Sequence, residues 1–399
     1  MTLRHSRRFY VTAGLLIFIG IVSIVRVFIA IGKADTIWID FPGQYQLCAY
    51  VVKGVDPYPY IGSNNIPEQV REIGSIPATW NAVPWGLLLG NVFYAGFLNI
   101  KHAKIFYIVM NVLLFLLLTI SISKKARKIY RSKEFECLAV ILVFSPDFLL
   151  SIGSANAGGM ICIMLLLAWI FCDDRPILAG ILLGLAMVKP QDALIICFAF
   201  LLGKRFMPLV VAAVVDLAAW LCVSLMTSRG MIELLKEFMM KGAGSVNRYS
   251  GILTLFFSNR TIALIASMTV GIVFVLLMDY IYSRRTTRDN EHFRLCFSYV
   301  ASVFWSYAYW CDNYVLLFPA IVCLYIMIKS IRFKDYILWL AACLYCNYGI
   351  YVKSGTIWIR IIGHTITNTD RHLINTIYAI GLIIISFFIS LHFSRAKTE

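Results

Sequence analysis

Long apolar runs recur along the chain, and they constrain its fold more than any other feature of the sequence. A helix needs about 20 predominantly apolar residues to cross the hydrocarbon core of a bilayer. On that measure the sequence predicts about 12 spanning helices, at roughly 9–32, 103–123, 135–152, 156–172, 176–189, 191–203, 207–227, 261–282, 293–311, 314–330, 335–352 and 372–394. We therefore expect an all-α polytopic membrane protein that forms a single integral membrane domain over residues 1–399.

The composition excludes an ordinary soluble protein. Of 399 residues, 60% are hydrophobic and 14% are charged, and the mean hydropathy is +0.79. Soluble chains average about 45–50% apolar and about 25% charged residues. The net charge of +15 falls in short clusters between apolar runs, as in the loops of membrane proteins, so nucleic-acid binding is not expected.

The positive charges predict how the chain is oriented. Lys and Arg are dense in short segments such as 1–8, 124–134 and 283–294, and such segments favour the cytoplasmic side. Both termini are then cytoplasmic in a multi-pass protein of the cell membrane. Two long segments, 33–102 and 228–260, are extracytoplasmic.

The two long segments favour a catalytic surface on a helical base, because function concentrates on loops held by a rigid scaffold. Within the first, residues 81–99 are apolar but contain Pro84 and several Gly and Asn. We expect a half-buried or interfacial helix there. The expected helices 176–189 and 191–203 are short, and we interpret them as a broken pair that meets at Lys189-Pro190-Gln191-Asp192.

Several short motifs occur in order between residue 40 and about residue 319. They are Asp40-Phe41-Pro42-Gly43-Gln44-Tyr45, Gly54-Val55-Asp56-Pro57-Tyr58, Gly153-Ser154-Ala155-Asn156, the run from Ala179-Gly180 to Lys189-Pro190-Gln191, and Asn247-Arg248-Tyr249-Ser250-Gly251. The ordered set resembles family 87 glycosyltransferases, GT-C-type membrane enzymes that include polyprenyl-phosphate-mannose-dependent mannosyltransferases. The resemblance implies a GT-C-type bundle with long extracytoplasmic loops bearing short interfacial helices.

Two motifs depart from the family. The segment Gly153-Ser154-Ala155-Asn156 lacks the Gln of the family's Gly-Gln-x-Asn. Where the family often has Ser-Pro-x-x-Trp-x-His, this chain has Ser306-Tyr307-Ala308-Tyr309-Trp310-Cys311-Asp312, so Asp312 stands at the position of the His. A contact that depends on His is therefore not carried over to this chain.

The resemblance implies transfer of a hexose, expected to be mannose, from a polyprenyl phosphate to a lipid-linked or cell-envelope glycan acceptor, with inversion. Such a transfer needs a base for the acceptor hydroxyl and donors for the leaving phosphate. Asp40 can meet a donor whose tail stays in the bilayer, and we expect it to be the base. Asp35 and Asp56 are the alternatives, although the Asp-Pro-Tyr turn favours a structural role for Asp56.

Two basic residues are candidates for binding the donor phosphate. Lys189 ends an apolar run, where a charge needs a partner or a ligand. Its alternative is a snorkelling lysine paired with Asp192. Arg248 is the second candidate, and its alternative is a solvated loop charge. The residues expected to contact substrate are Tyr45, Gln44, Asp56, Tyr58, Asn156, Gln191, Trp310 and Asp312.

No metal or cofactor is expected, because the six histidines are dispersed and the Asp-x-Asp pair of nucleotide-sugar enzymes is missing from the sequence. A transporter or flippase of lipid-linked sugars is the alternative function, and a non-catalytic membrane scaffold is a third. Many transporters have paired halves, whereas the Asp40–Tyr58 element has no convincing second copy in this sequence. The enzyme is therefore the leading hypothesis.

Overall fold

The computed structural model describes residues 41–78, 82–90, 92–130, 157–246 and 259–283, together with single positions elsewhere. The expected spans at 135–152, 293–311, 314–330 and 335–352, and most of 9–32 and 372–394, lie outside the described residues. The total of about 12 spans therefore stays a prediction.

The chain divides into two compact units. Unit 1 comprises Met1–Thr12, Leu194–Lys204 and Arg248–Glu399, and unit 2 comprises Ala13–Ala193 and Arg205–Asn247. The expected single membrane domain over 1–399 stays a prediction.

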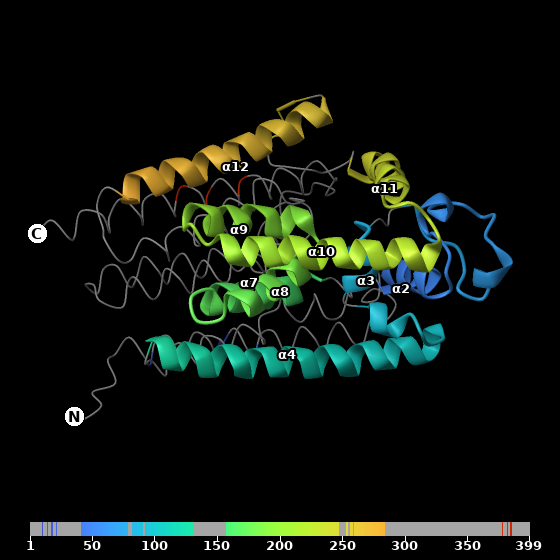
Figure 1. Ribbon diagram of the computed structural model, residues 1–399, viewed down its shortest axis with the longest axis horizontal. Helices are drawn as coiled ribbons and strands as arrows, with labels where there is room; N and C mark the ends of the chain where they lie inside the picture. Colours follow the sequence, from blue (N-terminus) through green and yellow to red (C-terminus); the bar gives the residue numbers. More distant parts are fainter. Residues whose placement is uncertain are drawn as a thin grey trace, which may run out of the picture. The chain divides into compact units, whose positions relative to one another are not determined.

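The regular elements of the described residues are helices, apart from an isolated parallel β-bridge between Ile61 and Ile76. Unit 2 contains α2 (Phe41–Val52), α3 (Gly86–Leu89), α4 (Ile100–Tyr130), α7 (Gly158–Phe171), α8 (Pro176–Ala186), α10 (Phe206–Thr227), α11 (Met231–Val246) and the 3₁₀ turns η2 (Tyr58–Tyr60), η3 (Glu68–Val70) and η4 (Phe93–Ala95). Unit 1 contains α12 (Arg260–Ser283) and most of α9 (Pro190–Leu202). In unit 2 the long helices run side by side, and α2, α3 and α11 gather at one end (Figure 1).

Helices are confirmed at the expected spans that the structure describes. Two helical stretches are long and apolar enough to cross a membrane, Ile100–Leu118 within α4 and Phe206–Thr227, which is α10. Shorter apolar helices occupy the other described spans, within 156–172, 176–189, 191–203 and 261–282. The all-helical class is thus confirmed for the described part of the chain.

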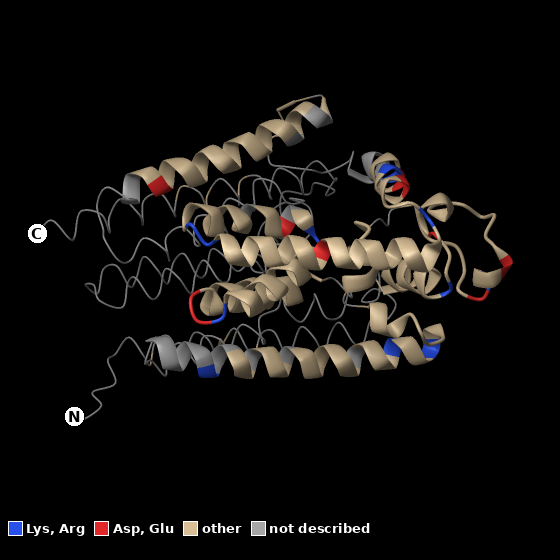
Figure 2. Cartoon of the chain, viewed as in Figure 1, with Lys and Arg blue, Asp and Glu red and all other residues tan. Residues whose placement is uncertain are grey.

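The surfaces of α4 and α10 suit contact with lipid. On α10, the leucines at 217, 221 and 225 are 57%, 48% and 71% exposed, and they recur every four residues along one face. Contiguous apolar surface of this kind marks an interaction site or a membrane contact. The charged residues of α4 lie near its two ends, with none from Ile105 to Ser123 (Figure 2).

Two glycines allow α8 and α10 to pack in close contact. A Cβ atom on Gly180 would lie 2.4 Å from the Cβ of Val211 and 2.8 Å from the carbonyl oxygen of Pro208. A Cβ atom on Gly184 would lie 3.0 Å from the Cβ of Val215. Small residues four apart let membrane helices approach closely. The glycines of the 179–191 motif therefore act in helix packing.

One expected helix is much shorter in the structure. The sequence predicts a half-buried or interfacial helix over 81–99, whereas the described residues of this stretch form the short helix α3 and the turn η4. α3 ends at Gly90, where a Cβ atom would lie 2.6 Å from the carbonyl oxygen of Gly86. The chain becomes extended at Gly90, with φ −58° and ψ 144°. The backbone geometry at this glycine therefore ends the helix.

The first long segment packs against the end of α10 and against α11 through one hydrophobic cluster, which we call the junction cluster. Its members are Leu47, Tyr50, Val51, Tyr58, Ile61, Val70, Ile76, Leu87, Val223 and Leu234. Val223 belongs to α10 and Leu234 to α11, so the two long segments of the chain share a core.

The close packing of α8 on α10 gives a first prediction. Gly180→Ala should lower the stability of the protein by about 1–3 kcal/mol, because the added methyl group overpacks the interface. The expected observation is a lower Tm in detergent. Gly14→Ala is the matched control, since a Cβ atom there meets nothing within 4 Å. Equal Tm values for the two variants would contradict the packing role of Gly180.

Candidate functional site

The structure describes only part of the predicted site. Gln44, Tyr45, Asp56, Tyr58 and Lys189 lie within the described residues, as does the backbone of Gln191. The other predicted residues, Asp40, Asn156, Arg248, Trp310 and Asp312, lie outside the described residues.

Lys189 lies at a break between two apolar helices. α8 ends at Ala186 and α9 begins at Pro190, which confirms the expected broken pair. Proline suits the first turn of a helix because its missing N–H has no helical partner there. The carbonyl oxygen of Lys189 accepts the N–H of Asp192 at 3.0 Å, so the backbone turns directly into α9. Lys189 lies at this break and is half-buried.

The first long segment packs onto the break immediately before Lys189. The indole Nε1 of Trp85 donates a hydrogen bond of 2.8 Å to the carbonyl oxygen of Met187. A Cβ atom on the next residue, Gly86, would lie 3.3 Å from the carbonyl oxygen of Val188. Trp85 and Met187 are 102 residues apart in the sequence. Their contact fixes the backbone on the N-terminal side of Lys189.

A second tryptophan supports Trp85 from α10. The ring centroids of Trp85 and Trp220 are 6.1 Å apart, and the ring planes are tilted by 56°. The Nε1 atom of Trp220 is buried and has no hydrogen-bond partner within the described part of the chain. Among the described residues the two indoles therefore differ in one respect: the N–H of Trp85 has an acceptor, and that of Trp220 has none.

Tyr45 and Tyr58 contribute to packing. They are 2% and 0% exposed, and their hydroxyl groups donate hydrogen bonds to the carbonyl oxygens of Leu98 at 2.6 Å and Ala82 at 2.7 Å. Gln44 is half-buried on α2 beside Tyr45 in the sequence. Substrate contact stays a prediction for all three residues.

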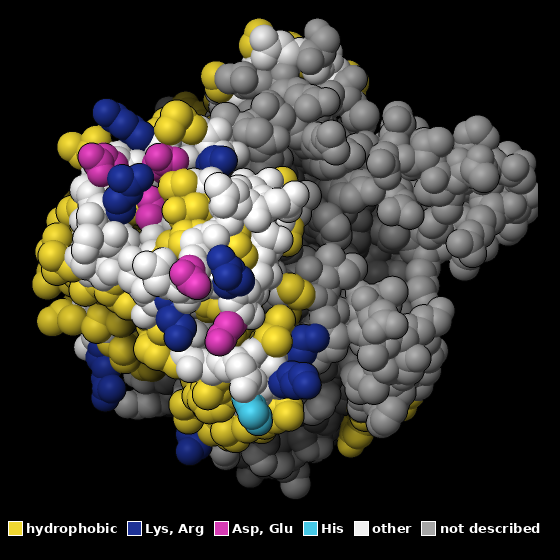
Figure 3. All heavy atoms as spheres, turned by 90° about the vertical axis from the view of Figure 1, so that its right-hand side faces the viewer, with side chains coloured by type: hydrophobic (Ala, Val, Ile, Leu, Met, Phe, Trp, Pro, Cys, Tyr) yellow, Lys and Arg dark blue, Asp and Glu magenta, His cyan; other side chains and the backbone are white. Residues whose placement is uncertain are grey.

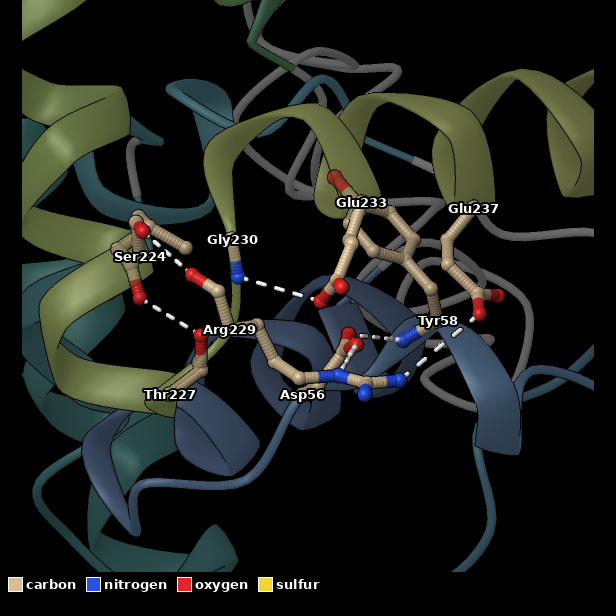
Figure 4. A network of polar contacts seen from close by, with 9 residues as sticks. Asp56, Tyr58, Ser224, Thr227, Arg229, Gly230, Glu233 and Glu237 are labelled. Atoms are coloured by element: carbon tan, nitrogen blue, oxygen red, sulfur yellow. Dashed lines mark hydrogen bonds and ion pairs between the residues drawn. The ribbon is translucent and has the colours of Figure 1, made fainter.

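Asp56 is buried and has two polar partners. Its Oδ1 accepts the N–H of Tyr58 at 3.0 Å, and its Oδ2 accepts the Nε–H of Arg229 at 3.2 Å (Figure 4). The first bond forms an Asx turn, which confirms the turn role that the Asp-Pro-Tyr motif favoured. Substrate contact by Asp56 stays a prediction.

Two groups near Asp56, Arg229 and Tyr58, have raised pKa values. The hydrogen bond that Arg229 donates to Asp56 raises the pKa of Arg229, so the guanidinium stays charged. Burial, followed by the negative charge of Asp56, raises the pKa of Tyr58 well above its usual value. Tyr58 is therefore a neutral hydrogen-bond donor at neutral pH.

The end of unit 2 that contains these residues has a polar surface. Acidic and basic side chains are interspersed on it, and hydrophobic side chains gather along its flank (Figure 3). Among the described residues, no group of three or more His, Cys, Asp or Glu could hold a metal ion.

Trp85 and Arg229 were not predicted as site residues. A tryptophan in an apolar stretch is equally typical of a membrane interface, and Arg229 has no motif around it. Only the fold brings them to Met187 and Asp56.

The described residues form an all-α fold with two helices long and apolar enough to cross a bilayer, which is consistent with a membrane protein. The model for glycosyltransferase family 87 matches residues 84–329, which is more than half of the chain. The chain therefore belongs to glycosyltransferase family 87 and is a membrane glycosyltransferase. The match includes Trp85 and Lys189 and begins after the Asp40–Tyr58 motifs. No curated protein and no solved structure matches the chain.

The contact between Trp85 and Met187 gives a second prediction. Trp85→Phe should lower stability by about 1–3 kcal/mol, because it leaves a carbonyl group at the helix break without its donor. Trp220→Phe removes the same ring volume but no hydrogen bond. A larger drop in Tm is therefore expected for Trp85→Phe. A larger loss at position 220 would contradict the role of the indole N–H at position 85.

Proposed function

We propose that this glycosyltransferase transfers the hexose mannose from a polyprenyl-phosphate donor to a lipid-linked or cell-envelope glycan acceptor. The transfer proceeds with inversion at the anomeric carbon. The family match over residues 84–329 is the observation that carries the proposal. It also favours an enzyme over the alternative, a transporter or flippase of lipid-linked sugars.

The proposed reaction takes place on the extracytoplasmic side of the cell membrane. α4 starts beside η4 with Lys101 and Lys104, and its other end contains four basic residues between 124 and 128. Because basic residues favour the cytoplasm, this asymmetry supports an extracytoplasmic position for the two long segments. Both chain termini are then cytoplasmic, as the charge pattern of the sequence predicts.

In the proposed step, the carboxylate of Asp40 takes the proton of the acceptor hydroxyl group. The acceptor oxygen attacks the anomeric carbon from the face opposite the phosphate, and the bond between that carbon and the phosphate oxygen breaks. Polyprenyl phosphate leaves with the bonding electrons. Asp40 directly precedes Phe41, the first residue of α2. The proposed base is therefore adjacent in sequence to a helix.

Lys189 and Arg248 are the proposed ligands of the donor phosphate. A lysine between two apolar helices is costly in a bilayer and calls for an anionic partner. The bond from Trp85 to Met187 holds the backbone next to it, which supports a preorganised site for the leaving phosphate. Pairing of Lys189 with Asp192 is the competing explanation. The polyprenyl tail would remain among lipid chains.

The other residues proposed to contact the sugar or the acceptor come from several parts of the chain. They are Gln44, Tyr45, Asp56, Tyr58, Asn156, Gln191, Trp310 and Asp312. The amides can donate hydrogen bonds to sugar hydroxyl groups and accept them, the carboxylates can accept them, and the tryptophan can stack on a pyranose ring.

A third prediction tests the phosphate site. Lys189→Ala should weaken donor binding by roughly 10- to 150-fold, because a hydrogen bond to a charged group contributes about 1.5–3 kcal/mol. Acceptor binding should change little. Lys236→Ala on α11 is the control, since Lys236 is exposed. Unchanged donor affinity in folded Lys189→Ala protein would favour the pairing with Asp192.

A fourth prediction tests the base. Asp40→Asn keeps the size of the side chain but cannot take up the proton, so turnover should fall by about 100- to 10,000-fold. Donor binding should survive. Asp35→Asn is the control and should be nearly silent. If Asp40→Asn keeps near-normal turnover while Asp312→Asn abolishes it, the base lies at the position where the family often has His.

A further inference from the structure

An ion pair joins the two long segments of the chain. The Nε of Arg229 lies 3.2 Å from Oδ2 of Asp56, although the two residues are 173 apart in the sequence. The side chain of Asp56 is 7% exposed and that of Arg229 is 42% exposed. A second carboxylate, from Glu237 on α11, lies 3.9 Å from the same guanidinium group (Figure 4).

The backbone around Arg229 is held on both sides. Ser228 has a left-handed conformation with φ 53°, and it ends α10. The N–H of Arg229 donates to the carbonyl oxygen of Ser224 at 3.1 Å, and the Ser224 hydroxyl donates to the carbonyl oxygen of Arg229. The N–H of Gly230 donates to the Glu233 carboxylate at 3.3 Å. The corner between α10 and α11 therefore presents Arg229 from a fixed position.

The other partner is equally fixed. α2 ends in a turn at Gly54, whose φ of +75° favours glycine. A Cβ atom at Gly54 would lie 3.3 Å from the carbonyl oxygen of Met226 in the last turn of α10. Because Tyr58 donates its N–H to the first oxygen of Asp56 and Arg229 donates to the second, both carboxylate oxygens are engaged.

We propose that Arg229 is a positioning residue. Through Asp56, it fixes the C-terminal end of α2 on the corner between α10 and α11, and the junction cluster fixes the rest of the helix. The first residue of α2, Phe41, directly follows Asp40 in the sequence, so a shift of α2 is expected to reach the proposed base. The effect on turnover rests on the proposed function, in which Asp40 is the base.

This role is an alternative to the substrate contact proposed for Asp56, because protein donors engage both of its carboxylate oxygens. Removal of a group that binds substrate raises KM. Its effect adds to the effect of removing a residue that it does not contact. A positioning pair acts as one unit, so its two single losses do not add. Removal of Arg229 leaves the buried carboxylate of Asp56 without its charged partner. Misplacement of catalytic groups by about 1 Å can cost about 100-fold in rate.

The test is a double-mutant cycle with Asp56→Asn, Arg229→Gln and the double variant, assayed at equal amounts of folded protein. We expect each single variant to lower kcat by roughly 10- to 100-fold, with the KM for donor and for acceptor nearly unchanged. The double variant should be no slower than the slower single variant. Arg71→Gln is the control, because its ion pair with Glu68 is exposed, at 71% and 88%, and it should leave kcat unchanged.

Two results would overturn the proposal. One is a double variant whose loss in kcat equals the product of the single losses. The other is a rise in KM of about tenfold or more, the signature of a lost contact of about 1.4 kcal/mol, in Asp56→Asn.

A second readout does not depend on the chemistry. Amide hydrogen exchange over residues 41–60 should become faster in Arg229→Gln and stay unchanged in Arg71→Gln. Unchanged exchange over 41–60 in Arg229→Gln would overturn the positioning role even if Asp40→Asn abolishes turnover. Conversely, an active Asp40→Asn variant would refute the proposed base, while faster exchange in Arg229→Gln would still support the ion pair as the anchor of α2.

Discussion

A helix that ends leaves its last carbonyl groups without helical partners, and a buried carbonyl group needs another donor. The break between α8 and α9 meets this constraint through the indole N–H of Trp85, which binds the carbonyl oxygen of Met187. The break thus becomes possible because the first long segment packs onto it. The same contact holds the backbone before Lys189, the charge that this part of the fold has to accommodate.

The polar end of unit 2 is one folded body. The junction cluster combines residues of the first long segment with Val223 of α10 and Leu234 of α11, and the Asp56–Arg229 ion pair lies beside it. Apolar burial supplies the general attraction between the segments. The ion pair adds a directional contact that fixes which residues face each other.

Much of the helical framework could be predicted from the sequence, because apolar runs and prolines act locally. The break before Pro190 and the turn at Asp56 are examples. α3 is shorter than expected because Gly90 allows the chain to turn extended where apolar composition alone suggested a longer helix. Trp85 and Arg229 could not be assigned, since their partners lie far away in the sequence and no local spacing encodes such contacts.

We propose that the sugar comes from a polyprenyl monophosphate. The direct measurement incubates purified protein with polyprenyl-phosphate-mannose and an envelope lipid extract, and follows released polyprenyl phosphate together with the mannosylated product. We expect both products to appear in equal amounts, and only when the acceptor extract is present. Transfer supported by a nucleotide sugar, with no release from the polyprenyl donor, would contradict it.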